Sequence, residues 1–199
     1  MVASSKTVGV LALQGDVREH AKMLRDVSVA VKLVKESNDL ADLDGLVIPG
    51  GESTTISMLI NRANLMQPLR EFVSSGKAVY GSCAGMILLA DRILDGRPDQ
   101  ESIGGLDITV KRNAFGRQVD SFEKRIDLSK IGVLDFNAVF IRAPWVEKVG
   151  SGVEVLASIE YQSADPRIVM VKQGNLLATS FHPELTGDNR VHQYFVSLL

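Results

Sequence analysis

The sequence contains a single cysteine, Cys83, among 199 residues. One thiol cannot form an internal disulfide, and it cannot build the multi-cysteine sites that bind structural zinc. A lone cysteine is most often a small buried hydrophobe, so only its neighbours can indicate chemistry. No cluster of residues suggests a metal ion or an organic cofactor, and we expect neither on this chain.

Basic residues are not in excess either, since 22 Lys and Arg stand against 24 Asp and Glu for a net charge of −2. Such a balance does not favour neutralising nucleic-acid phosphates, so we expect no nucleic-acid partner. The densest apolar run, residues 84–90, is far shorter than a membrane span. The first six residues lack the apolar stretch of a secretory signal. We therefore expect a cytoplasmic protein with no membrane partner.

The composition is that of an ordinary globular protein, with 45% hydrophobic and 23% charged residues. A chain of this length fits one domain, and no linker rich in Pro, Gly or Ser divides it. We expect a single domain over residues 1–199.

Strand-like and helix-like segments alternate through the first half of the chain. Apolar runs rich in β-formers predict buried strands, and apolar residues at helical spacing predict helices between them. The predicted strands cover residues 7–13, 29–34, 46–48 and 78–80, and the predicted helices begin near 17, at 53 or 54 with Ser53 or Thr54 as cap, at 67 and at 84, the last ending at 91. This alternation predicts a three-layer, doubly wound, mostly parallel α/β sheet with helices on both faces.

The second half contains mostly strand-like segments, which predict additional antiparallel strands. A Gln-Gly-Asn turn at 173–175 predicts a hairpin between the last two. The predicted segments are 106–110, 138–141, 155–159, 168–171 and 176–180, with a closing helix over 190–198.

The strongest local motif is Gly-Ser-Cys-Ala-Gly at residues 81–85, between a predicted strand and a predicted helix. This is the spacing of a nucleophile elbow, with cysteine in place of serine. The flanking glycines permit the sharp turn, and the helix N-terminus favours a thiolate over a thiol. The amide of Ala84 then points to where an oxyanion would form. We predict Cys83 as a nucleophile.

A thiolate nucleophile needs a base, and only three histidines are available. His182 lies in Phe-His-Pro-Glu, just beyond an apolar strand. In an extended backbone His182 and Glu184 face the same side, although a turn after the strand would alter this. Glu184 is then placed to orient the ring of His182 as in a catalytic triad. His20 and His192 fall within predicted helices, and we interpret them as packing or surface residues.

Two further features lie at predicted strand ends, where parallel sheets bind ligands. Gly50 and Gly51 let backbone amides approach a substrate, so Gly51 is a candidate second donor of the oxyanion hole. The basic residues Arg112, Arg117 and Arg142 remain. Arg142 follows an apolar run, and an arginine at a strand end is usually solvated, but it could instead bind a substrate carboxylate or an acidic partner group.

Together these motifs resemble the triad-type, class I glutamine amidotransferases. Within them the closest resemblance is to the glutaminase subunits of two-component pyridoxal 5'-phosphate synthases, and it extends from about Thr7 to the C-terminus. It rests on long motifs at residues 11–15, 49–55, 83–85, 112–118, 140–144 and 180–186. Ser82 departs from the family, which often has threonine there.

The resemblance implies that Cys83 attacks the side-chain amide of L-glutamine to form a thioester, that ammonia leaves with a proton from His182, and that water releases glutamate. It also implies that the ammonia passes to a synthase subunit that makes pyridoxal 5'-phosphate in vitamin B6 biosynthesis, in a large hetero-oligomer. The implied glutamine-binding residues are Gly51, Glu52, Ser53, Arg112, Ile141 and Arg142, and Gln14 is implied near the partner contact.

Two other functions remain open at this point. One is a different cysteine hydrolase built on the same elbow, which would need no partner. The other is a non-catalytic subunit that binds a ligand or senses redox state through Cys83.

Overall fold

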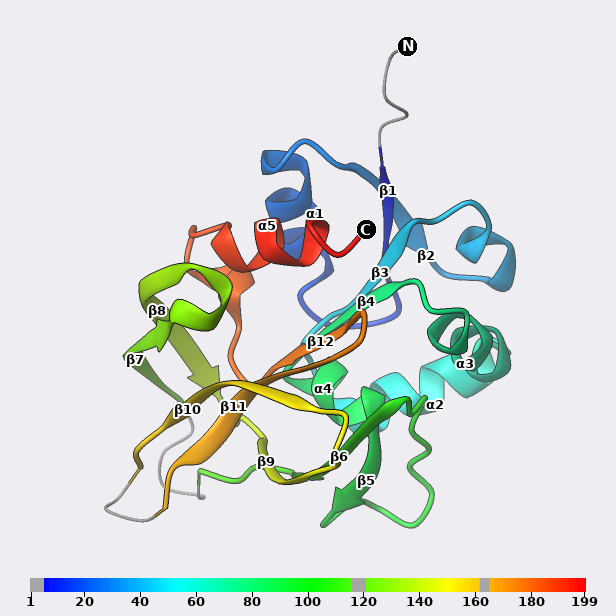
Figure 1. Ribbon diagram of the computed structural model, residues 1–199. Coiled ribbons are helices and arrows are strands. Elements are labelled where there is room, and N and C mark those ends of the chain that lie inside the picture. Colours follow the sequence, from blue (N-terminus) through cyan, green and yellow to red (C-terminus); the bar gives the residue numbers. More distant parts are fainter. Residues whose placement is uncertain (1–5, 116–120, 162–164) are drawn as a thin grey trace.

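The computed structural model describes residues 6–115, 121–161 and 165–199. Their elements follow the predicted alternation of strands and helices, with more strands in the second half (Figure 1). In chain order they are β1 (Thr7–Leu11), α1 (Val17–Asp26), β2 (Ala30–Val34), the short 3₁₀ helix η1 (Ser37–Leu40), β3 (Gly45–Ile48), α2 (Ser53–Arg62), α3 (Met66–Ser74), β4 (Ala78–Ser82), α4 (Ala84–Leu89), β5 (Ala90–Leu94), β6 (Leu106–Lys111), β7 (Ser121–Leu128), η2 (Ser129–Ile131), β8 (Val133–Ile141), β9 (Trp145–Val149), β10 (Glu154–Ile159), β11 (Arg167–Gln173), β12 (Leu176–Thr179), η3 (Pro183–Leu185) and α5 (Arg190–Val196).

The main sheet has the order β2-β1-β3-β4-β12-β11-β9-β6-β5, with β10 paired to β11. The first five strands of this order are mutually parallel. From β12 onward the pairs β12–β11, β11–β9 and β9–β6 are antiparallel. The loop between β11 and β12 is the predicted hairpin, since Gln173 pairs with Leu176. The prediction of a mostly parallel sheet with added antiparallel strands is confirmed.

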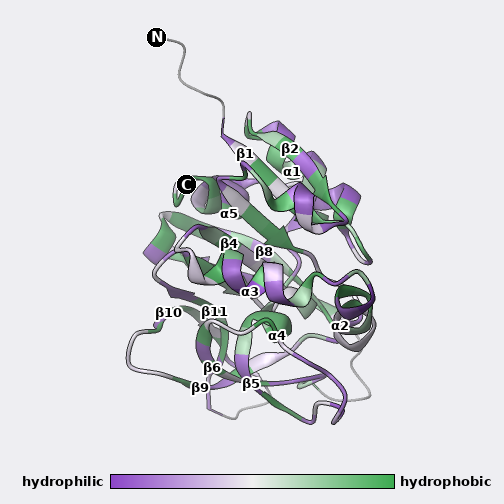
Figure 2. Ribbon diagram, turned by 90° about the vertical axis from the view of Figure 1, so that its right-hand side faces the viewer, coloured by the Kyte–Doolittle hydropathy of each residue, from purple (hydrophilic) through white to green (hydrophobic). Residues whose placement is uncertain are grey.

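Helices cover both faces of the parallel strands (Figure 1). On one face α2, α3 and α4 pack against residues such as Ile48 and Val79. On the other face α1, α5 and the β7–β8 ribbon pack against residues such as Val47 and Tyr80. Consecutive strand residues thus pack into the two cores on opposite faces of the sheet, because side chains alternate across a strand. Figure 2 shows hydrophilic and hydrophobic residues mixed along α1 and α3, as expected for helices with one face on a sheet.

The antiparallel pair β7–β8 forms a separate two-stranded ribbon. The backbone amide of His182 donates a hydrogen bond to the carbonyl of Val139 in β8 at 2.8 Å. Phe136 and Phe140 of β8 pack against Phe181. The ribbon is therefore attached to the segment that follows β12, and its end at Ile141 lies near the carboxyl ends of the parallel strands.

Two predictions about local structure are wrong. The helix from Ala84 ends at Leu89 rather than at 91, because Ala90 pairs with Leu106 and begins β5. Neither Ser53 nor Thr54 caps α2. The cap is Glu52, whose carboxylate accepts the amides of Thr54 and Thr55 at 3.2 and 2.7 Å.

The strands β5, β7 and β9 were not predicted from sequence. In β7 exposed and partly buried residues alternate, and its sequence has no apolar run. Its partner β8 supplies the pairing that makes it a strand. Among the described residues, no helix combines the length and apolar character needed to cross a membrane.

Gly85→Ala tests how tightly the turn after β4 is packed. A Cβ at Gly85 would overlap the backbone carbonyl oxygen of Ile48, which cannot move aside as a flexible side chain can. We expect the free energy of unfolding to fall by at least about 2 kcal/mol in urea denaturation. The control Gly152→Ala meets no atom within 4 Å, and its change should stay within about 0.5 kcal/mol. Equal stabilities of the two variants would contradict this packing.

Candidate active site

Cys83 occupies the predicted sharp turn between β4 and α4. Its backbone lies at φ 47° and ψ −100°, a conformation that non-glycine residues rarely adopt. Its amide donates to the carbonyl of Thr179 in β12 at 2.8 Å, and its thiol lies 3.8 Å from the carbonyl oxygen of Ile141, to which it donates. The strained turn therefore directs the sulfur toward the end of the β7–β8 ribbon, as in a nucleophile elbow.

His182 follows β12 and lies beside Glu184. The ring Nδ1 and the carboxylate Oε1 of Glu184 are 2.8 Å apart. The backbone does not stay extended as predicted, because Pro183 begins the 3₁₀ turn η3 and this turn carries Glu184 back under the ring. Glu184 has a fully buried side chain, and that of His182 is only 5% exposed. Buried Nε2 of His182 makes no hydrogen bond to any described residue, so this nitrogen is free to serve the nucleophile or the substrate.

Asp16 brings a second carboxylate to the same ring. Its Oδ2 lies 3.2 Å from Nδ1 of His182. Asp16 occupies the N-cap position of α1 yet makes no side-chain cap hydrogen bond, although aspartate is among the best capping residues. Its carboxylate is instead used on His182. The ligand atoms of Asp16, His182 and Glu184 all lie within 4.8 Å of one another, and the contacts of Nδ1 with the two carboxylates account for their closeness.

These contacts set the charges at the site. Burial lowers the pKa of His182, but the contacts with Asp16, Cys83 and Glu184 outweigh burial and raise this pKa far above its ordinary value. Burial likewise acts to raise the pKa of Glu184, but contacts with His20 and His182 lower it well below its usual range. The base is thus held as an imidazolium beside an ionised carboxylate, which suits proton donation to a leaving group.

A cavity of about 380 Å³ opens above Cys83. Of the predicted site residues that the structure describes, all but Glu184 and Ala84 line it, and these two are buried. Arg117 lies outside the described residues. The lining residues are Gln14, Asp16, Gly51, Glu52, Ser53, Cys83, Ile87, Arg112, Asn113, Ile141, Arg142 and His182.

The loop after β3 supplies one wall of this cavity. The amide of Glu52 donates to Oε1 of Gln14 at 3.0 Å. Gly51 has a φ of +151°, which residues with a side chain rarely adopt, and a Cβ there would displace the end of the Gln14 side chain. The predicted site loop and Gln14 are therefore in direct contact.

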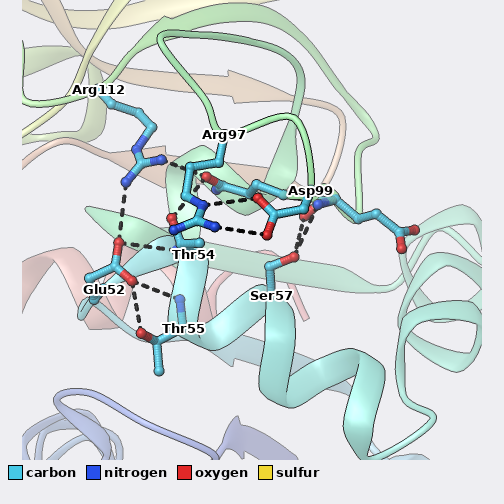
Figure 3. A network of polar contacts seen from close by, with 9 residues as sticks. Glu52, Thr54, Thr55, Ser57, Arg97, Asp99 and Arg112 are labelled. Carbon is cyan, nitrogen blue, oxygen red and sulfur yellow. Dashed lines mark hydrogen bonds and ion pairs between the residues drawn. The ribbon is translucent and has the colours of Figure 1, made fainter.

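Glu52 and Arg112 form a further wall, together with the loop that precedes β6 (Figure 3). Nη2 of Arg112 lies 3.2 Å from Oε1 of Glu52, and Nη1 donates to Oε1 of Gln100 at 2.6 Å. Burial opposes the negative charge of Glu52, but hydrogen bonds from Thr55 and Thr54 lower the pKa of its carboxyl group. The same ion pair borders a neighbouring cavity of about 590 Å³, so it separates two hollows.

Ile141 and Arg142 form the wall contributed by β8. Ile141 is 37% exposed, which is unusual for a large apolar residue. Arg142 follows with φ 43°, and this backbone conformation turns the chain out of the strand. Within residues 6–115, 121–161 and 165–199, Arg142 has no ion-pair partner. Its guanidinium is therefore not neutralised by any carboxylate that the structure describes.

Two residues close to the triad were missed by sequence reasoning. Asp16 carried no signal beyond its place before a helix. His20 was interpreted as a packing or surface residue, and it is indeed fully buried, but its Nε2 lies 3.4 Å from Oε1 of Glu184. Its place in a predicted helix did not distinguish packing from surface exposure. Which residues it faces depends on a contact between segments 164 positions apart.

Residues 10–199 match the SNO glutamine amidotransferase family. The chain is 56% identical to a pyridoxal 5'-phosphate synthase subunit PdxT from Kineococcus radiotolerans, over 100% of this chain and 97% of the relative. It is 55% identical to a subunit of the same name from Salinispora arenicola, over 98% of each chain. A crystal structure described as a glutamine amidotransferase is similar with a TM-score of 0.86 and 47% identity, over 96% of this chain and 97% of the other.

Asp16→Asn tests the second carboxylate on His182. The substitution removes the charge and keeps the size, so the pKa of His182 should fall, yet stay above its ordinary value because Glu184 remains. The measurement is an NMR titration of the His182 Cε1 resonance in ¹³C-histidine-labelled protein. Asp26→Asn, in the same helix but paired with exposed Lys22, should leave the titration unchanged. An unaltered pKa in Asp16→Asn would show that Glu184 and Cys83 set the charge of the ring without Asp16.

Proposed function

The chain belongs to the SNO glutamine amidotransferase family, and we propose on this basis that Cys83, His182 and Glu184 hydrolyse the side-chain amide of L-glutamine to glutamate and ammonia. The observation that carries the proposal is that Cys83, on a strained elbow, lines the same cavity as His182. We also propose that residues 1–199 form one amidotransferase domain.

In the first step Cys83, as a thiolate whose proton has passed to Nε2 of His182, attacks the amide carbon and a tetrahedral oxyanion forms. The amides of Ala84 and Gly51 are the proposed donors to this oxyanion. The imidazolium of His182 gives its Nε2 proton to the leaving nitrogen, and ammonia departs as the thioester forms. Glu184 holds Nδ1 at 2.8 Å throughout, so it keeps the ring oriented while its charge changes.

In the second step a water molecule attacks the thioester, and His182 takes a proton from that water. The same oxyanion donors stabilise the second tetrahedral intermediate. Its collapse breaks the carbon–sulfur bond and releases glutamate, and Cys83 with His182 returns to the starting state. One base thus serves both steps because its proton is lost in the first and regained in the second.

The substrate's own charges fit the walls of the cavity. Arg142 is the proposed partner of the glutamine α-carboxylate, because no described residue neutralises it. Glu52 and Ser53 are the proposed contacts for the α-amino group and backbone of the substrate. Arg112 holds Glu52 at 3.2 Å, so its proposed role is to keep that carboxylate in place, and Ile141 covers the aliphatic part of the substrate.

We further propose that ammonia passes to a synthase subunit that makes pyridoxal 5'-phosphate, in a hetero-oligomer. The support is the identity of 55–56% over nearly whole chains to subunits that carry this name. Gln14 is proposed to lie near the partner contact. Because Gln14 also holds the amide of Glu52, docking there would act directly on the loop that contains Gly51.

Cys83→Ala should lower glutamate release at least about 1,000-fold, because the thioester cannot form. Release from L-glutamine is measured for the chain alone and with an equimolar synthase subunit, with circular dichroism to check folding. For the unaltered chain, low release that rises strongly with the partner supports both the reaction and its dependence on docking. Full release without a partner would favour a separate cysteine hydrolase. No release in either case, with Cys83 reduced, would overturn the reaction and favour a binding or redox-sensing subunit.

Arg142→Ala should raise KM for glutamine roughly 10- to 100-fold, which corresponds to one lost hydrogen-bonded charge pair of about 1.5–3 kcal/mol. Steady-state kinetics with the synthase subunit present provide the measurement. Arg125→Ala is the matched control, because Arg125 is an exposed arginine on β7 whose partner is Asp135. An unchanged KM in Arg142→Ala would assign the substrate carboxylate to another residue.

A further inference from the structure

We propose that His20 is a positioning residue for the amidotransferase reaction, and that it holds the carboxylate of Glu184 from the core side while His182 holds it from the cavity side. This inference rests on the proposed function. His20 does not line the cavity, so it acts through Glu184 and never touches the substrate.

The buried state of Glu184 creates the need for such a residue. Its side chain is fully buried, and its Oε2 has no hydrogen-bond partner among the described residues. An ionised carboxylate in the core is costly unless other groups compensate its charge. His182 supplies one contact from the cavity side. On the opposite side, Nε2 of His20 lies 3.4 Å from the same oxygen.

His20 also connects the two halves of the candidate triad. Its Nε2 lies 2.9 Å from Oγ of Ser82, the residue that precedes Cys83 in β4. One ring nitrogen therefore faces both the carboxylate behind the base and the hydroxyl beside the nucleophile. The family often has threonine at the position of Ser82. Serine and threonine both carry a hydroxyl, and the hydroxyl is the group that makes this contact.

His192 of α5 determines which nitrogen of His20 carries the proton. Nδ1 of His20 and Nε2 of His192 are 3.0 Å apart, and Nδ1 of His192 is buried without a described partner. With the proton on Nε2 of each ring, His192 donates to His20, and His20 donates toward Ser82 and Glu184. The opposite arrangement would bury an unpaired N–H on His192 and place a bare nitrogen of His20 against a carboxylate oxygen. The first arrangement satisfies more groups.

Among the described residues, few charged groups surround the network of His20, His192 and Glu184. Burial lowers the pKa of His192 to about 3, so this ring stays neutral. The other titratable groups facing the cluster are Tyr80, whose ring lies 5.9 Å from that of His20 and whose hydroxyl bonds to Thr179 at 2.9 Å, and His182, Cys83 and Asp16 beyond Glu184.

His20 and His192 are polar residues in the core, and burying their rings costs free energy of desolvation. The cluster lies between α1 and α5, whose other buried residues include Leu24, Val191 and Phe195. Apolar side chains of similar size would fill this space with no polar group to desolvate, and such replacements are often neutral or stabilising. The pair is therefore explained by the contact of His20 with Glu184 and by the contact of His192 with His20.

Two amide variants separate this role from packing. The side-chain nitrogen of His20→Gln can occupy the place of Nε2 and still donate to Glu184. His20→Asn is too short to reach Glu184, although it can still contact His192. With the synthase subunit present, we expect His20→Asn to lower kcat at least about 10-fold, the loss of one hydrogen bond to a charged group, with KM within twofold. His20→Gln should recover most of kcat.

The pH profile supplies a readout that packing alone would not move. His20 lowers the pKa of Glu184, so in His20→Asn this pKa should rise, and kcat should be lost at a higher pH as the solution is acidified. Tyr80→Phe is the stability control, because it removes a buried hydroxyl from the same core without touching Glu184. Urea unfolding compares the three variants.

The outcomes are distinct. If the unaltered chain releases no glutamate, the proposed function fails before His20 is considered. Suppose instead that the unaltered chain is active. If kcat and the acidic limb of its pH profile are then the same in His20→Asn as in Tyr80→Phe, the positioning role is overturned. If His20→Asn does not fold, ¹⁵N NMR of the unaltered chain decides, since a proton on Nε2 of His20 is required and a proton on Nδ1 alone would refute the proposal.

Discussion

The strained backbone of Cys83 is the constraint on which the rest of the site depends. A residue held at φ 47° and ψ −100° costs of the order of 1–3 kcal/mol, so its surroundings must prevent the chain from relaxing. Three features do this. The strand β4 is paired in parallel on both sides, the amide of Cys83 is bonded to Thr179, and Gly85 is pressed against the backbone of Ile48. The parallel sheet is thus the rigid support that holds the sulfur of Cys83 at the cavity.

The β7–β8 ribbon completes what the sheet begins. In β8 the carbonyl of Val139 accepts the amide of His182, and the carbonyl of Ile141, two residues later, accepts the thiol of Cys83. The base-bearing segment and the nucleophile are therefore held by one strand that lies outside the main sheet. This explains why Ile141 and Arg142, at the end of that strand, lie in the wall of the cavity.

The sequence predicts those features that depend on neighbours along the chain. The Gly-Ser-Cys-Ala-Gly elbow is local, and so is the pairing of His182 with Glu184 two residues later. The parallel order follows from alternating strands and helices. The contacts of His20 and Asp16 could not be predicted, because each requires that the start of α1 meet the segment after β12. The cap at Glu52 was missed because glutamate is not among the preferred capping residues, and β7 was missed because only its partner strand makes it a strand.

The single thiol of this chain also determines how it responds to oxidants. Cys83 is the candidate nucleophile and has no second cysteine to protect it through an internal disulfide. A sulfenic acid formed there can be reduced only by a small thiol or by another protein, and further oxidation is irreversible. The rate of ammonia production would therefore fall in proportion to the fraction of Cys83 that is oxidised. The same property makes a thiol-specific reagent a direct count of active sites, one per chain, in any preparation.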